Sequence, residues 1–141
     1  MLKSKIQSLL KCSEGATAVA LAAGMPVLVG GFGLGAEVGY WYFNERKIQN
    51  AADVAAYAGA ASLRSGNIAM IEPSAETAAV ETGYRADRGN LEARRSPTSG
   101  AFAGDANAVE VVVQEDLPRM FSGLFADGPV AVQGRSVARI S

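Results

Sequence analysis

Residues 15–36 form an apolar segment that contains no Asp, Glu, Lys or Arg. A helix rises about 1.5 Å per residue, so this segment would measure about 33 Å as a helix. The hydrocarbon core of a bilayer is about 30 Å thick, and a helix can cross it because its backbone hydrogen bonds are satisfied internally. Pro26 lies near the middle of the segment, and a helix tolerates proline better in a membrane than in water. The segment therefore predicts a single transmembrane helix.

The flanks of this segment predict its orientation. Lys3, Lys5 and Lys11 precede it, and residues 40–43 (Tyr-Trp-Tyr-Phe) follow it. Basic residues favour the cytoplasmic side, and aromatic residues favour the membrane interface. We therefore expect a cytoplasmic leader at 1–12, a transmembrane segment at 13–43 and an extracytoplasmic domain at 44–141. Two alternatives stay open: a buried helix of a soluble protein, and a secretory signal cleaved near residues 33–36.

Composition narrows the classes of function. The chain has no histidine, a net charge of −1 and one cysteine, Cys12. These features argue against a His-based catalytic triad, a zinc site and an electrostatic nucleic-acid surface. Glu110 and Glu115 lie an odd number of positions apart, so on a strand they would face opposite sides. We expect no enzyme activity, no cofactor, no metal and no small-molecule substrate.

The helix is predicted to continue beyond the membrane. Residues 44–63 are rich in alanine and other helix formers, and residues 65–67 form a stop signal, so the whole helix would be about 50 residues long. Its outer half carries mostly small residues three or four positions apart: Ile48, Ala52, Ala55 and Gly59. This face would pack against the protein's own domain; a contact with a partner subunit is the alternative.

The remaining sequence predicts a small α+β domain. A short helix is expected at about 74–82, and residues 83–105 read as a surface loop whose order the sequence does not fix. Residues 108–114 and 129–140 read as strands, and the apolar spacing at 117–125 predicts a short amphipathic helix between them. The fold class is thus α+β, with a long transmembrane-to-envelope helix packed on a small antiparallel sheet.

Several motifs resemble a known family. They are Glu14-Gly15-Ala16-Thr17-Ala18-Val19, then Glu37-Val38-Gly39-Tyr40 after the apolar span, then residues 49–56 (QNAADVAA), and more weakly the strands of the tail. The chain resembles short TadG-like (TadE/TadG-type) proteins of bacterial tight-adherence (Flp) pilus-assembly systems. The resemblance implies a candidate processing site between Gly15 and Ala16. Processed members often carry glutamate five residues after the glycine, where this chain has Ala20.

The resemblance implies a structural function. The chain would be a single-pass component of the bacterial inner membrane, with its C-terminal domain in the periplasm, that helps to assemble a Flp (Tad) type IVb pilus. Its partners would be the lipid bilayer and other pilus-assembly or pilin-like proteins. Glu37 and residues 45–47 (Glu-Arg-Lys) would set the register with those partners. The alternatives are a processed minor pilin within the filament, and a secreted soluble binding module.

Overall fold

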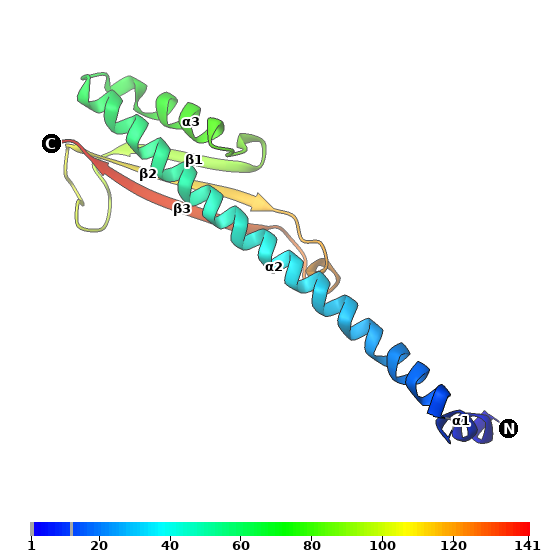
Figure 1. The fold of residues 1–141 in the computed structure, drawn as a ribbon. Coiled ribbons are helices and arrows are strands. Elements are labelled where there is room, and N and C mark those ends of the chain that lie inside the picture. The colour runs from blue at the N-terminus through cyan, green and yellow to red at the C-terminus, as the bar shows by residue number, and fades with distance from the viewer. Residues whose placement is uncertain (1, 12) are drawn as a thin grey trace.

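The computed structural model describes residues 2–11 and 13–141, so Met1 and Cys12 lie outside the described residues. A short helix, α1 (Leu2–Lys11), precedes the long helix α2 (Ser13–Arg64), and a third helix, α3 (Ile71–Glu81), follows. The sheet consists of β1 (Gly89–Arg95), β2 (Ala108–Leu117) and β3 (Val130–Arg139). Figure 1 shows α2 running from the leader into the domain, where it packs against both α3 and the sheet.

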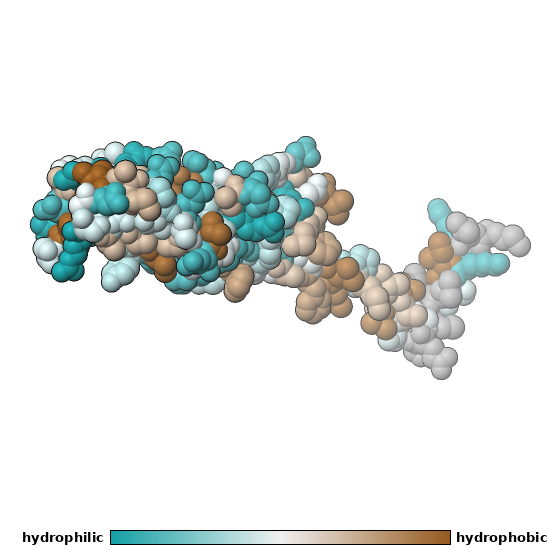
Figure 2. Space-filling view, turned by 90° about the horizontal axis from the view of Figure 1, so that it is seen from above, coloured by the Kyte–Doolittle hydropathy of each residue, from teal (hydrophilic) through white to brown (hydrophobic). Residues whose placement is uncertain are grey.

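Helix α2 is 52 residues long and continues through Pro26. Its first half projects from the domain, and Figure 2 shows apolar side chains along this projecting part. Val27 is 74% exposed and Phe32 is 78% exposed. Within the described residues, α2 is the one helix long and apolar enough to cross a membrane. The predicted helix of about 50 residues, apolar in its first half, is confirmed.

The end of α2 follows from a local turn. Gly66 adopts φ 78°, a conformation that glycine allows at little cost. The backbone N–H of Asn67 donates to the carbonyl of Ser62, and the N–H of Gly66 donates to the carbonyl of Leu63, which satisfies two free carbonyls at the helix end. The chain then turns back, so that α3 packs against the outer part of α2. Helix α3 begins at residue 71, somewhat earlier than predicted.

The three strands form an antiparallel sheet in the order β1-β2-β3. Val111 in the central strand pairs with Ala93 on one side and Ser136 on the other. One face of the sheet packs on α2, and its buried valines meet the alanines of the helix. The α+β fold class is therefore confirmed, as are the paired strands of the C-terminal third. The fully buried core residues include Ile48, Ala51, Ala52, Ala55, Ala56, Val109, Val111, Val113 and Leu117.

Two sequence predictions were wrong in detail. Residues 89–95 form strand β1 rather than a loop. Only Leu91 and Ala93 are apolar in this strand, too few to give a visible alternation. Residues 117–125 do not form an amphipathic helix: Leu117 ends β2, and a single 3-10 turn occupies Ser122–Leu124. The backbone of this segment instead donates hydrogen bonds to a carboxylate on α2.

Candidate functional site

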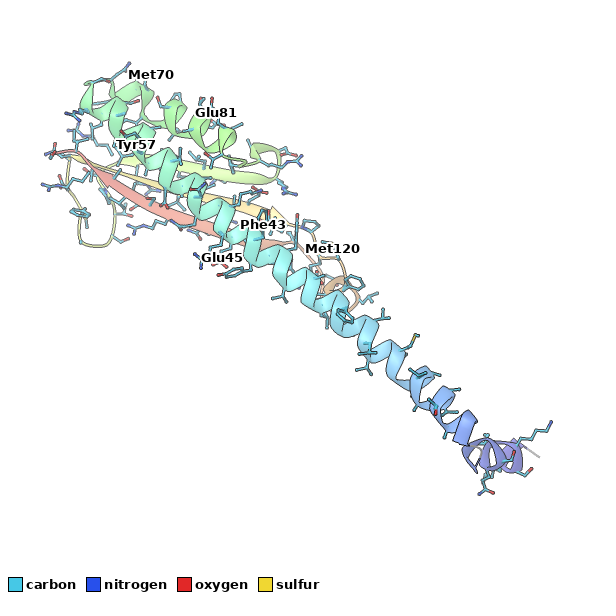
Figure 3. All side chains as sticks on the ribbon, viewed as in Figure 1. Phe43, Glu45, Tyr57, Met70, Glu81 and Met120 are labelled. Atoms are coloured by element: carbon cyan, nitrogen blue, oxygen red, sulfur yellow. The ribbon has the colours of Figure 1, made fainter. Side chains whose placement is uncertain are left out.

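The connection between β2 and β3 reaches along α2 toward the projecting half of the helix. We call residues 118–129 the junction loop. Figure 1 shows this loop extending beyond the sheet, beside the middle of α2, and Figure 3 places Met120 within it. The loop meets α2 where the apolar segment ends. It is therefore the part of the domain nearest to the predicted membrane boundary.

Glu37 holds the junction loop against α2. Its carboxylate accepts hydrogen bonds from the backbone N–H of Met120 at 2.7 Å and from that of Ser122 at 2.7 Å. The hydroxyl of Ser122 donates a third bond at 2.8 Å. Although Glu37 lies directly after the apolar segment, its side chain is buried. The sequence predicted that Glu37 would set register with a partner, whereas in this structure its hydrogen-bond donors come from its own chain.

Gly33 provides the second contact of the loop. A Cβ atom placed at Gly33 would lie 2.7–2.9 Å from three carbons of the Phe121 ring, which is closer than Cβ atoms approach other heavy atoms in real proteins. The ring can therefore rest on the helix because residue 33 lacks a side chain. At Gly24, Gly30, Gly31 and Gly35 an added Cβ would meet nothing within 4 Å. Gly33 thus differs from these four glycines, because an aromatic ring packs directly on it.

The aromatic cluster after the span divides between the core and the surface. Tyr40 and Trp41 pack against the buried core, whereas Tyr42 and Phe43 are exposed. The Arg119 guanidinium lies 5.8 Å from the centre of the Trp41 ring, a cation–π geometry, and donates to the Gly128 carbonyl at 2.9 Å. One arginine therefore joins the start of the junction loop to its end and to α2.

A buried charge cluster around Glu115 joins three elements of the domain. Glu115 is fully buried in β2 and accepts a hydrogen bond from Arg88 at 2.8 Å. Lys47 of α2 approaches the same carboxylate at 3.6 Å, and the backbone N–H of Arg85 donates to it at 3.3 Å. Burying a carboxylate is costly unless it is paired and hydrogen-bonded. These contacts therefore connect α2, β2 and the turn before β1.

Glu110 lies on the opposite face of the sheet from Glu115, as the odd spacing predicted. It pairs with Arg135 at 2.8 Å and accepts the backbone N–H of Thr98 at 3.3 Å. Burial acts to raise the pKa of Glu110, but the hydrogen bond and charge of Arg135 outweigh it and bring the pKa below its ordinary value of 4.5. Both carboxylates are thus held in structural ion pairs. Across the described residues, no group of three His, Cys, Asp or Glu side chains could hold a metal ion.

Comparison with protein families connects this architecture to a class of proteins. A family model described as putative Flp pilus-assembly TadE/G-like matches residues 15–62. A second model, described as putative Tad-like Flp pilus-assembly, matches residues 44–138, which is more than half of the chain. The chain belongs to the Tad-like Flp pilus-assembly family. A search of curated proteins and a search of solved structures gave no match.

The two family matches follow the architecture of the Tad-like chain. The first covers almost the whole of α2, and the second begins where α2 enters the domain and ends within β3. Membership supports a role related to the Flp pilus, and these families are described by pilus assembly rather than by an enzyme activity. The apolar helix and the family together fit a membrane-anchored protein.

The structure places most of the predicted site residues of this Tad-like chain in its own core. Ile48, Ala52 and Ala55 are fully buried, and a Cβ at Gly59 would lie 3.0 Å from the side chain of Val109. These side chains are therefore covered by the protein's own domain in this structure, and the contact with a partner subunit along this face stays a prediction. The candidate processing residues Gly15 and Ala16 lie in the first turn of α2, far from the domain.

Sequence reasoning missed the junction loop as a site. It identified Glu37 by its position after an apolar run. It had no means to pair Glu37 with residues 120–122, because those donors are backbone N–H groups that any residue carries. A glycine in the span and a phenylalanine in the tail likewise give no sign that they meet. The packing of β2 and β3 along α2 brings these parts together.

Proposed function

We propose that this protein is a structural component of the bacterial inner membrane that helps to assemble, anchor or initiate a Flp (Tad) type IVb pilus. The first half of α2 spans the bilayer, with the leader in the cytoplasm and residues 44–141 in the periplasm. The observation that carries this proposal is the shape of α2 in a chain of this family. Half of one helix is apolar and exposed, and the other half packs one of its faces against a folded domain.

The boundary between the two halves supports the proposed anchoring. The charge-free segment ends at residue 36, and the first carboxylate beyond it, Glu37, is paired within the domain rather than left in contact with lipid. The aromatic residues Tyr42 and Phe43 lie exposed directly beyond it. Carboxylates are unfavourable in hydrocarbon, and aromatic residues favour the interface. The bilayer surface would therefore cross α2 near residues 37–43.

Partners would pack against the projecting half of α2. The glycines at 24, 30, 31 and 35 have no neighbour within 4 Å of an added Cβ, so their surfaces are open. Small residues let membrane helices approach closely. We therefore assign the contact with other pilus-assembly or pilin-like proteins to the membrane half of α2, since the small-residue face of its outer half is already covered.

A processed minor pilin is the second candidate. Helix α2 begins at residue 13, beside the candidate processing site between Gly15 and Ala16. Cleavage there would remove the leader with α1 and leave a helix that begins almost at the new N-terminus. The same projecting helix would then lie in a filament core instead of in a bilayer.

The intact mass and N-terminal sequence of the protein recovered from its native envelope separate these functions. An N-terminus at or near Met1 in the membrane fraction supports a permanent anchor. A start at Ala16, with the protein present in sheared filaments, assigns it to the filament. A start near Glu37 in the soluble fraction refutes the membrane anchor and indicates a secreted binding module.

A deletion strain tests the role in assembly. We expect loss of Flp pili in a strain that lacks this protein and recovery when the full chain is supplied. Normal piliation in the deletion strain would rule out a necessary part in assembly.

A further inference from the structure

We propose that the junction loop is a second membrane contact, which inserts its apolar side chains into the outer leaflet of the bilayer beside α2. This inference rests on the proposed membrane span of α2. It assigns a lipid-binding surface to the β2–β3 connection, a part of the domain that lies more than 80 residues from the span in sequence. Four observations carry it: the depth of the loop, its backbone hydrogen bonds, its exposed side chains and its size.

The depth of the loop is fixed by its contact with α2. The Phe121 ring rests on Gly33, and Gly33 lies within the charge-free segment that ends at residue 36. Gly33 precedes Glu37 by four residues, which is about 6 Å along a helix. If the charge-free segment occupies hydrocarbon, the Phe121 ring lies at the outer edge of the hydrocarbon core.

The backbone of the loop suits an apolar medium. Irregular backbone is tolerated at membrane depth only where its polar groups are satisfied within the protein. The N–H groups of residues 120 and 122 donate to Glu37. Those of residues 124, 125 and 126 donate to the carbonyls of Phe121 and Ser122. The buried glutamate therefore has a direct use: it removes two backbone donors, and its own charge, from contact with lipid.

The large side chains that face outward from the loop are apolar, and one charged residue, Asp127, is exposed near the end of the loop. Leu124 is 81% exposed and Phe125 is 84% exposed, and Met120 and Phe121 are about half exposed. Large apolar side chains exposed together mark a surface that meets a partner or a membrane. The loop's arginine, Arg119, is turned back onto Trp41, where its charge lies at the level of the aromatic belt rather than at the loop tip. This arrangement matches the order of a bilayer interface, with apolar groups deeper and cationic groups nearer the headgroups.

The size of the surface favours lipid over a second copy of the chain. A stable protein interface buries about 800 Å² per partner and about 20–30 residues. The loop offers four large apolar residues within the six residues 120–125. This surface is continuous with the projecting half of α2, which is itself proposed to lie in lipid. A bilayer that surrounds α2 at Gly33 would meet the loop without any further association.

Site-directed fluorescence on the full chain in vesicles tests the inference. In a Cys12→Ser background, an environment-sensitive dye is attached to one new cysteine at a time: Leu124→Cys in the loop, Val27→Cys in the span, or Tyr57→Cys. Tyr57 is 76% exposed and lies at the far end of the domain from Met120. The vesicles contain phosphatidylcholine and phosphatidylglycerol, with nitroxide quenchers placed at shallow or deep positions on the lipid chains. All three sites are exposed in the domain or helix, so each label leaves the core intact.

We expect the shallow quencher to reduce emission at position 124 and the deep quencher to reduce it at position 27, with neither affecting position 57. Quenching at 27 without quenching at 124 would overturn the inference and leave the membrane span standing. Absence of quenching at both positions would overturn the span and the inference together. Label–label self-quenching at 124 that depends on protein density, without lipid quenching, would assign the loop to a second copy and also overturn the inference.

Discussion

The close approach of β3 to α2 gives the sharpest prediction of stability. Gly134 lies where the third strand crosses the helix: a Cβ atom there would sit 2.8 Å from the carbonyl oxygen of Ile48 and 2.8 Å from the Cα of Gln49. Both are backbone atoms, so no side-chain rotation can make room. The Gln49 side chain also bonds the backbone of Arg135 on both sides, accepting its N–H at 3.3 Å and donating to its carbonyl at 3.0 Å. Gly134→Ala must therefore push the strand away from the helix.

Overpacking of a well-packed core costs about 1–3 kcal/mol. A rigid backbone contact that is also held by hydrogen bonds belongs in the upper part of this range, so we expect a loss of about 2–3 kcal/mol. For a domain of about 100 residues, each kcal/mol lowers the midpoint of thermal unfolding by about 4–8 °C. The midpoint should therefore fall by about 8–24 °C.

The measurement is thermal unfolding of the full chain in detergent micelles, followed by near-ultraviolet circular dichroism, which reports aromatic packing in the domain. The matched control is Gly123→Ala in the junction loop, where the nearest atom to the new Cβ is the Arg119 Cβ at an ordinary 3.7 Å. The control should melt with the wild-type protein or slightly above it. A Gly134→Ala variant that melts within 1–2 °C of the control, an interval well below the about 4 °C expected from even 1 kcal/mol, would refute the packing argument.

Three further predictions follow from the contacts of the loop and the sheet. Gly33→Ala should displace the junction loop and speed tryptic cleavage after Arg119 in detergent, whereas Gly35→Ala, which meets no neighbour, should not; equal rates would contradict the packing of the Phe121 ring on Gly33. Because the pKa of Glu110 is lower in the folded protein, the stability that Glu110 contributes is present above about pH 4.5 and is lost as the pH falls through the folded-state pKa. The denaturation midpoint of Glu110→Gln should therefore depend less on pH across this range than that of the wild-type protein. An unchanged pH dependence in the variant would contradict this role of Glu110. Glu115→Ala removes the acceptor of a buried charge cluster and should lower the free energy of unfolding, measured by urea titration, by about 3 kcal/mol. A loss of less than about 1 kcal/mol would be inconsistent with a stabilising role of this cluster.

The sequence was sufficient where one physical pattern dominates a long stretch. The charge-free run and the alanine-rich segment behind it predicted α2, because length and helix propensity act at every residue of both. The β-branched run at 109–113 predicted β2 for the same reason. The small face at Ile48, Ala52 and Ala55 was correctly expected to pack against the protein's own domain.

The sequence was insufficient where tertiary contacts decide local structure. Strand β1 has only two inward apolar residues, and it forms because β2 offers an unpaired edge beside it. The apolar spacing at 117–125 matches a helix, yet Glu37 takes the backbone donors and the large side chains turn outward. Each outcome depends on partners at least 14 residues away in the sequence, which a short local window does not contain.

The absence of a linker within α2 has a mechanical consequence. Because one unbroken helix both enters the proposed membrane and carries the sheet, the domain cannot reorient without moving the segment below it. From Glu37 to Arg64 the helix extends about 40 Å, so a tilt of about ten degrees at the membrane would displace its far end by about 7 Å. Neighbouring helices that pack in the bilayer would therefore set the spacing and the angle of the domains above it. Moving the helix outward along its axis would move the domain outward by the distance that the helix travels.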